Sequence, residues 1–264
     1  MDIRRILAIY FRQLFLFRRS VARVLGVFYW STVELLLWGF ITLYLDQINR
    51  SSYNYATLLL GGFLLWDFFI RSNHGISISF LEDIWSRNVA NLFGSPLRIG
   101  EYLAGLVLIS ATNGIITVLV TATLAFIFFH FNVLELGWQL IPFALMIFAF
   151  GWALGFATIA FILRFGPSAE IFAWSIPFLL QPFSAVFYPI SALPTYFQGI
   201  AKFIPLTHIF EGMRTILHGG RVDGRSLIIA AALTALYLAL GIAIFIAMFH
   251  RARRQGFLVR FTTE

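Results

Sequence analysis

Three ionisable side chains in the last quarter of the chain have a spacing that could support catalysis. His208, Glu211 and Arg214 recur three residues apart, which places them on one face of a short helix. A histidine near a carboxylate can act in general acid–base catalysis, so an enzyme acting within a membrane is one hypothesis. The alternative is that the three side chains form a polar cap for an outer gate.

A second set of ionisable residues lies inside apolar stretches, where such residues usually have a function. Glu34 lies about 12 Å inside the first of these stretches, at about 1.5 Å of rise per residue. Asp67 and Arg71 are four residues apart and can pair on one helix face. The pair is either a structural ion pair that fixes packing or part of the polar lining of a passage. An ion-coupled transporter that uses these three residues is a further alternative.

Other recognisable sites for chemistry are missing from the sequence. There are no cysteines, and no HExxH or clustered-histidine pattern suggests a metal site. The only lysine, Lys202, lies outside any phosphate-binding loop, and the pattern GxxxxGK[ST] does not occur. No GxSxG segment indicates a serine hydrolase. We therefore expect this chain to bind no metal and no cofactor. If ATP drives it, another polypeptide binds the nucleotide.

The composition indicates how these residues are positioned. Of the 264 residues, 60% are hydrophobic and only 12% are charged, whereas a soluble domain carries about a quarter charged residues. The chain is therefore predicted to be an integral membrane protein with several spans. The net charge of +7 does not indicate a nucleic-acid partner, because the charges gather at the two ends beside apolar segments.

We predict an all-α membrane protein with six transmembrane helices in one domain, residues 1–264. The predicted spans are approximately 26–45, 55–80, 99–129, 140–163, 168–188 and 227–249. With the N-terminus inside, the inner segments hold thirteen arginines and the outer segments hold five basic residues. Because basic residues favour the cytoplasmic side, both termini are predicted to be cytoplasmic, including a tail at 251–264.

Residues 1–24 are predicted to form an amphipathic helix at the membrane interface, with its periodic part at 3–19. Apolar residues recur there at helical spacing, while Arg5, Arg12 and Arg19 share another face. A basic helix with an aromatic and aliphatic face lies at the membrane surface. This helix is either a simple anchor or a docking element for a partner.

A second amphipathic helix is predicted in the inner connection, residues 81–98. Its apolar residues follow one helical stripe: Leu81, Ile84, Trp85, Val89, Leu92 and Phe93. Glu82, Asp83 and Arg87 fall elsewhere, and a Gly-Ser-Pro sequence ends the helix. A short helix held between two spans can move them as a unit when something pushes it. A passive interfacial loop is the alternative.

The region 189–220 is apolar but too broken to form one spanning helix. Pro189, Pro194 and Pro205 interrupt it, and each proline removes a backbone donor and clashes with the preceding turn. A broken segment persists at membrane depth only where protein or a water-filled cavity surrounds it. This pattern predicts re-entrant outer gate helices between the fifth and sixth spans.

These features resemble the permease subunit of ABC type-2 exporters. The most specific similarity is the run FYPISALPTYFQGIAKFIPLTHIFEGMR at 187–214, and the Ser95-Pro96 ending followed by Glu101-Tyr102 is a weaker one. The resemblance covers nearly the whole chain. It implies a basic interfacial helix, six spans, a cytoplasmic coupling helix between spans two and three, and two short outer helices.

The resemblance also implies partners. A homodimer would form through spans one and five, and two copies of a separate ATP-binding subunit would carry ATP and Mg²⁺. The coupling helix, with Glu82, Asp83, Trp85 and Arg87, would contact that ATPase, as would residues 3–19. The outer gate would include Pro194, Pro205, His208, Glu211 and Arg214.

The leading hypothesis is therefore a multi-pass exporter permease in the plasma membrane of a bacterium, its inner membrane. It would move an amphipathic or hydrophobic cargo outward, in contact with membrane lipid, while the partner hydrolyses ATP. The family carries drugs, lipids, lipo-oligosaccharides and polysaccharides, and no motif in this sequence selects among them. The ion-coupled transporter and the intramembrane enzyme are the alternatives.

Overall fold

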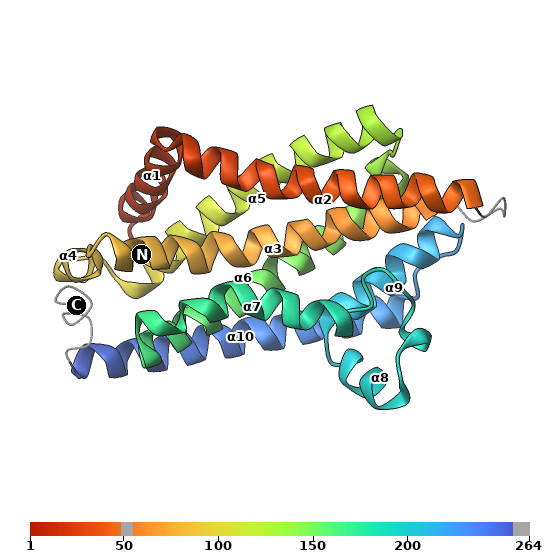
Figure 1. Ribbon diagram of the computed structural model, residues 1–264. Helices are drawn as coiled ribbons and strands as arrows, with labels where there is room; N and C mark the ends of the chain where they lie inside the picture. Colours follow the sequence, from red (N-terminus) through yellow and green to blue (C-terminus); the bar gives the residue numbers. More distant parts are fainter. Residues whose placement is uncertain (49–54, 256–264) are drawn as a thin grey trace.

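The computed structural model describes residues 1–48 and 55–255, which form helices and turns without any strand. Five long helices run lengthwise through the molecule (Figure 1). They are α2 (Val21–Ile48), α3 (Tyr55–Trp85), α5 (Ile99–Phe129), α6 (Leu140–Phe165) and α10 (Gly224–Arg254).

Shorter helices connect the long ones or lie at their ends. They are α1 (Ile3–Arg19), α4 (Val89–Gly94), α7 (Ile171–Leu180), α8 (Thr195–Ala201) and α9 (Pro205–Leu217). Short 3₁₀ segments occur at η1 (Val133–Gln139), η2 (Pro167–Glu170), η3 (Gln181–Phe183) and η4 (Ile190–Ala192).

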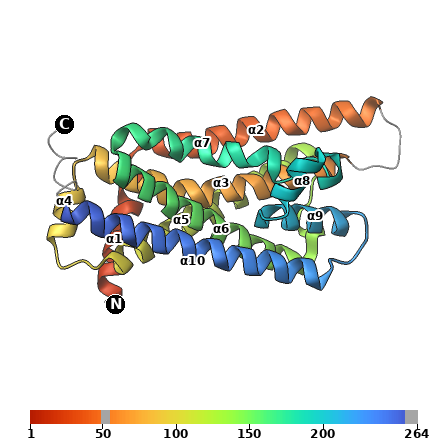
Figure 2. The ribbon, with the colours of Figure 1, turned by 90° about the horizontal axis from the view of Figure 1, so that it is seen from below.

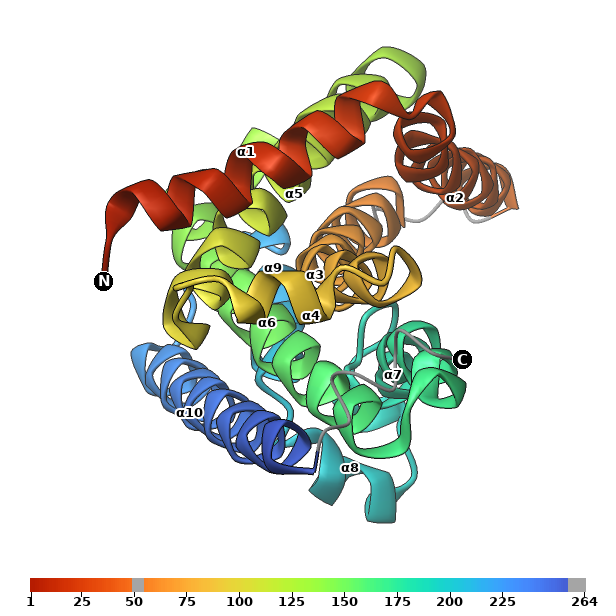
Figure 3. The ribbon, with the colours of Figure 1, turned by 90° about the vertical axis from the view of Figure 1, so that its left-hand side faces the viewer.

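The two ends of the bundle differ in what they carry. One end, called here the α4 end, holds α1, α4 and the last turn of α10 (Figures 1 and 2). The other, called the α9 end, holds α8, α9 and the start of α10. Viewed from the α4 end, α1 runs across the bundle over α5 (Figure 3). The predicted interfacial helix is thus a separate element that lies across the long helices.

Four helices in the described ranges are long and apolar enough to cross a membrane. They are Arg23–Ile48, Ile99–Phe129, Gly137–Phe165 and Gly224–Arg254, which correspond to predicted spans one, three, four and six. The second predicted span is also a helix, α3, of 31 residues. It is not among the four, and it carries Asp67 and Arg71 near its middle.

The fifth predicted span, 168–188, is broken rather than continuous. Its α-helical part, α7, has only 10 residues, or about 15 Å of length. The 3₁₀ turns η2 and η3 adjoin it, and Pro177 lies inside it. Prolines at 167, 177 and 182 explain the interruption, since each lacks the N–H that a continuing helix needs.

α3 is the central helix of the molecule, and its middle is almost completely buried, including Leu60, Phe63 and Phe69. It packs against α2, α5, α6, α7 and α9. The crossing with α6 is close because glycine faces α3: a Cβ added at Gly151 would lie 1.7 Å from Ser72 Oγ. Small residues at such a crossing let two backbones approach.

The predicted coupling helix is divided in two, which corrects the sequence-based expectation. α3 continues through Trp85, and a new six-residue helix, α4, begins at Val89. Between them Arg87 adopts a left-handed conformation, with φ of 55°. The Arg87 and Asn88 amides donate to the carbonyls of Ile84 and Asp83, a pattern that closes a helix C-terminus. The apolar stripe therefore lies on two helices.

Candidate functional site

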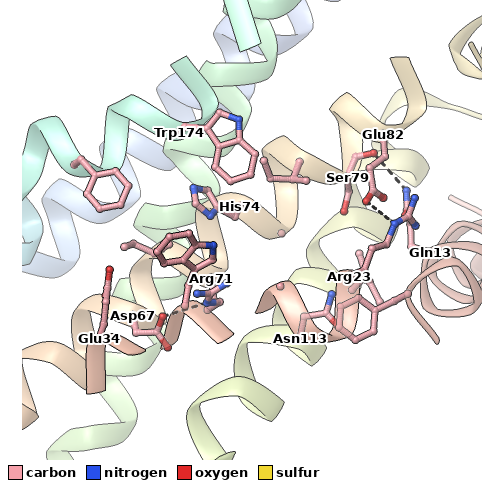
Figure 4. Close-up of a pocket in the computed structure, with 18 residues that line it drawn as sticks. Gln13, Arg23, Glu34, Asp67, Arg71, His74, Ser79, Glu82, Asn113 and Trp174 are labelled. Carbon is pink, nitrogen blue, oxygen red and sulfur yellow. Dashed lines mark hydrogen bonds and ion pairs between the residues drawn. The ribbon is translucent and has the colours of Figure 1, made fainter. Parts of the chain in front are cut away.

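A cavity of about 640 Å³ lies between α1, α2, α3, α5 and α7. Figure 4 shows its polar residues in two groups. One group, Glu34, Asp67 and Arg71, lies midway along α2 and α3, and the other, Arg23 and Glu82, lies toward the α4 end. The cavity thus brings together the three intramembrane residues that the sequence singled out.

Asp67 and Arg71 form an ion pair, as their spacing predicts, and the pair is joined to α2. Arg71 Nε donates to Asp67 Oδ1 over 3.1 Å. Ser31 Oγ lies 2.9 Å from both carboxylate oxygens of Asp67, and Arg71 Nη2 donates to Ser31 Oγ over 3.0 Å. Asp67 is only 1% exposed. This closed triangle stabilises the α2–α3 contact, because each buried charge has a partner.

Glu34 lies one turn beyond Ser31 on the wall of the same cavity. Within the described residues, its carboxylate has no ion pair within 4.0 Å and accepts no hydrogen bond. It is partly exposed, so a molecule inside the cavity can reach it. Glu34 therefore differs from Asp67, whose charge is already balanced.

The α4 end of the cavity is lined by a second ion pair. Arg23 Nε lies 3.0 Å from Glu82 Oε1, which joins the first turn of α2 to the last turns of α3. The sequence assigned Glu82 to the partner-binding surface. In the structure it instead faces the cavity, where it is half-buried.

Asp83 is buried between helices rather than presented to a partner, which differs from the sequence-based expectation. Arg12 Nη2 lies 2.6 and 2.7 Å from its two carboxylate oxygens, and Tyr102 donates its hydroxyl hydrogen to Oδ2 over 2.7 Å. Asp83 lies beyond the predicted span, which ends at residue 80. Burial raises the pKa of this carboxyl above its usual range, while Arg12 and the Tyr102 hydrogen bond oppose the shift. Asp83 therefore holds α1 against α3 and α5.

Glu101 holds the start of α1 in the same way. Its Oε1 accepts from the Asp2 amide over 2.8 Å, its Oε2 accepts from the Arg98 amide over 2.9 Å, and Arg5 Nη1 lies 3.6 Å from Oε2. Arg5 and Arg12 thus both face buried carboxylates, whereas Arg19, the third member of the predicted basic face, is exposed.

Trp85 and Arg87 are the two predicted coupling residues that remain accessible. Trp85 is 53% exposed, and its Nε1 donates to Glu170 Oε2 over 3.2 Å, which links α3 to the start of the broken segment. Arg87 is exposed in the turn before α4. A partner that docks at the α4 end can contact both.

At the α9 end, Arg214 holds the irregular chain that follows α7. Its Nη2 donates to the Ala185 carbonyl over 2.6 Å and to Glu211 Oε1 over 3.1 Å, and its Nη1 donates to the Val186 carbonyl over 3.3 Å. Glu211 Oε1 also accepts from the Ile190 amide over 2.7 Å. Both side chains therefore supply hydrogen-bond partners to backbone amide and carbonyl groups that lie outside any regular helix.

His208 does not join this arrangement. Its Nε2 lies 2.9 Å from the Lys202 carbonyl, and its Nδ1 lies 3.5 Å from Ser226 Oγ. The predicted gate prolines lie at helix starts, Pro194 before α8 and Pro205 as the first residue of α9. The three ionisable residues thus do not converge on a shared site for chemistry.

A family model for ABC-2 type transporters matches residues 6–218. The chain belongs to the ABC-2 type transporter family. The match runs from α1 through α9, so it includes the cavity, both ion pairs and the Arg214 contacts. No curated protein matches the chain. The chain is therefore a multi-pass membrane protein and the permease part of a transporter.

Sequence reasoning missed the contacts of several residues that shape this ABC-2 permease. Ser31, Tyr102 and Glu101 complete the polar networks, and His74 packs against Trp174 at 5.1 Å between ring centroids on the cavity wall. A signal existed for Glu101, which occupies the third position of α5, where an acid can cap the helix start. Tyr102 entered the sequence analysis only through the Glu101-Tyr102 similarity, and Ser31 and His74 carried no local signal because their partners are distant in the chain.

Proposed function

We propose that this chain is the permease subunit of an exporter that a separate ATP-binding subunit powers. The family membership supports a transport role, and the sequence lacks a phosphate-binding loop of its own. The partner, in two copies, would bind ATP and Mg²⁺ and dock at the α4 end. This end would face the cytoplasm, in agreement with the distribution of arginine, in a bacterial inner membrane.

One observation carries the mechanism: charge pairs next to the cavity join both α1 and α2 to the last turns of α3. Arg12 binds Asp83, and Arg23 binds Glu82, which itself lines the cavity. A push on the exposed Trp85 and Arg87 would therefore move α3, α1 and the cavity wall together. ATP-driven closure of the partner would supply that push, and the region around α8 and α9 would open on the outer side.

A homodimer would complete the passage. The face of α2 carries large exposed apolar side chains, including Tyr29, Trp30 and Leu37, and α7 exposes Trp174 and Phe178. Three of these residues also line the cavity: Trp30, Trp174 and Phe178. In this proposal α3 acts as the second span and the broken 168–188 segment as the fifth, so six membrane-crossing segments place both termini on the same side.

The two rival functions have less support from the geometry. An enzyme would need His208 and Glu211 to act together, but Glu211 is engaged by Arg214 and the Ile190 amide. An ion-coupled transporter would need a set of carboxylates that can change their charge. Asp67 is already paired with Arg71, which leaves Glu34 as the one unpaired carboxylate among the described residues that line the cavity.

Co-purification from native membranes tests the proposal. We expect the tagged chain to bring down a soluble subunit with ATPase activity. Trp85→Ala combined with Arg87→Glu should reduce the amount of this subunit at least several-fold. Arg225→Glu, an exposed arginine at the α9 end, is the matched control and should not. ATP hydrolysis or transport by the isolated chain in liposomes would contradict the proposal.

A further inference from the structure

We propose that the cavity binds a cationic amphipathic cargo and that Glu34 pairs with its positive group. This inference rests on the proposed transport function and names the chemical class of what is moved. A cavity of about 640 Å³ lies within the range of about 300–1,000 Å³ that is typical of small-molecule sites. The volume suits a molecule of drug size rather than a polymer.

The residues that line the cavity include three carboxylates and two arginines, so one carboxylate has no arginine partner. Two arginines line it, and each has its own carboxylate: Arg71 pairs with Asp67 at 3.1 Å, and Arg23 pairs with Glu82 at 3.0 Å. Glu34 has no such partner among the described residues. An unpaired carboxylate in apolar surroundings is costly, so the site favours a ligand that carries a positive charge.

Aromatic rings from two of the helices that line the cavity favour the same ligand. Trp30 lies on α2 one turn before Glu34, and Trp174 and Phe178 lie on α7. Rings of this kind attract cations through their faces and also bury apolar surface. An amphipathic cation would therefore satisfy both the carboxylate and the aromatic walls, whereas an anion would meet repulsion from Glu34.

His74 is the remaining ionisable side chain in the middle of the cavity, and its surroundings suit a neutral ring. Its Nε2 is buried without a hydrogen-bond partner in the described part of the chain, and Arg71 lies one turn before it. A charged imidazole would need partners at both nitrogens. His74 therefore does not supply the missing positive charge for Glu34.

Equilibrium dialysis with labelled tetraphenylphosphonium tests the inference on the full chain in a nonionic maltoside detergent, without ATP or partner. We expect saturable binding that unlabelled tetraphenylphosphonium displaces and that neutral triphenylphosphine oxide does not. Glu34→Gln should weaken binding by about tenfold or more, because the cation loses its counter-charge. Glu34→Asp, which keeps the charge, should retain most of the affinity.

The matched control is Asp46→Asn, which removes an exposed carboxylate from the same helix outside the cavity. Its affinity should equal that of the unmodified chain. Unchanged binding in Glu34→Gln, or an equal loss in Asp46→Asn, would overturn the assignment. The exporter proposal would survive that result, because co-purification of the ATPase tests it separately.

A second measurement leaves Glu34 in place, in case its substitution prevents folding. The chain has no cysteine, and an added side chain at Gly26, which lines the cavity, meets no atom within 4 Å. Tetraphenylphosphonium should protect Gly26→Cys from maleimide, and neutral triphenylphosphine oxide should not. Equal protection by both compounds would contradict the role of charge. Displacement by phosphatidylethanolamine would show that the site accepts the ammonium group of a lipid, and a lack of displacement would exclude this lipid as the cargo.

Discussion

Arg12 Nη2 lies 2.6 and 2.7 Å from the two carboxylate oxygens of Asp83, which joins the helix lying across the bundle to the last turns of α3. The two residues are 71 positions apart in the chain. Asp83 is 2% exposed, so its carboxylate is shielded from solvent. This buried contact therefore holds α1 against α3.

Removing either member of this pair should destabilise the protein. We expect Arg12→Ala or Asp83→Ala to lower the free energy of unfolding by about 1–3 kcal/mol, since a buried polar partner is left unsatisfied. The double variant should cost less than the sum of the two. Thermal unfolding of the four proteins in detergent measures this coupling, and strict additivity would show that the pair contributes nothing.

Breaking the Asp67–Arg71 pair near the middle of α3 should also destabilise the protein. Arg71→Met leaves Asp67 buried without its cation and should lower the melting temperature more than the combined change Arg71→Met with Asp67→Leu. Ser31→Ala should have a smaller effect of the same sign, because the ion pair itself remains. A double variant less stable than Arg71→Met would contradict a mainly structural role for the pair.

The close crossing of α3 and α6 predicts a strong effect of one methyl group. In Gly151→Ala the new Cβ would meet Ser72 Oγ at 1.7 Å and the Asn73 amide nitrogen at 3.1 Å. Rotation of Ser72 alone does not remove both contacts, so we expect a loss of about 1–3 kcal/mol in stability. Gly199→Ala in α8 meets open space and should be neutral or slightly stabilising. Denaturation in detergent compares the two.

Arg214 should determine the order of the irregular segment after α7. Arg214→Lys keeps the charge but cannot reach the Ala185 and Val186 carbonyls and Glu211 at once, since lysine lacks the guanidinium fork. We expect faster amide hydrogen exchange in residues 184–190, while the exposed Arg225→Lys control leaves exchange unchanged. Unaltered exchange in Arg214→Lys would remove this role.

Cysteine cross-linking tests the proposed homodimer, because the chain has no cysteine of its own. Leu37 is 50% exposed on α2. The variant Leu37→Cys should form disulfide-linked dimers under mild oxidation in the membrane. Leu236→Cys, 54% exposed on α10, is the control and should remain monomeric. Cross-linking through α10 alone would place the dimer contact on the other side of the bundle.

The sequence by itself determined the local properties of this protein. Hydrophobic composition and helical periodicity predicted a helical membrane protein, the helix at 3–19 and the pairing of Asp67 with Arg71. The prolines of 189–220 predicted the interruptions around α8 and α9, whereas the break in the fifth predicted span was not predicted. Periodicity, proline position and four-residue spacing act within a few turns of one helix, so they can be recognised without knowing the fold.

Only the tertiary structure decided which charges are satisfied. Asp83 has the local pattern of an exposed coupling residue, yet α1 covers it and supplies Arg12. Glu34 and Asp67 both appear as intramembrane acids in the sequence, and Arg71 on the same helix pairs with Asp67, but only packing places Ser31 against that pair and leaves Glu34 without a cation among the described residues. These outcomes depend on contacts between helices far apart in the chain. Burial and pairing of a charge follow from how the helices pack, which local sequence does not specify.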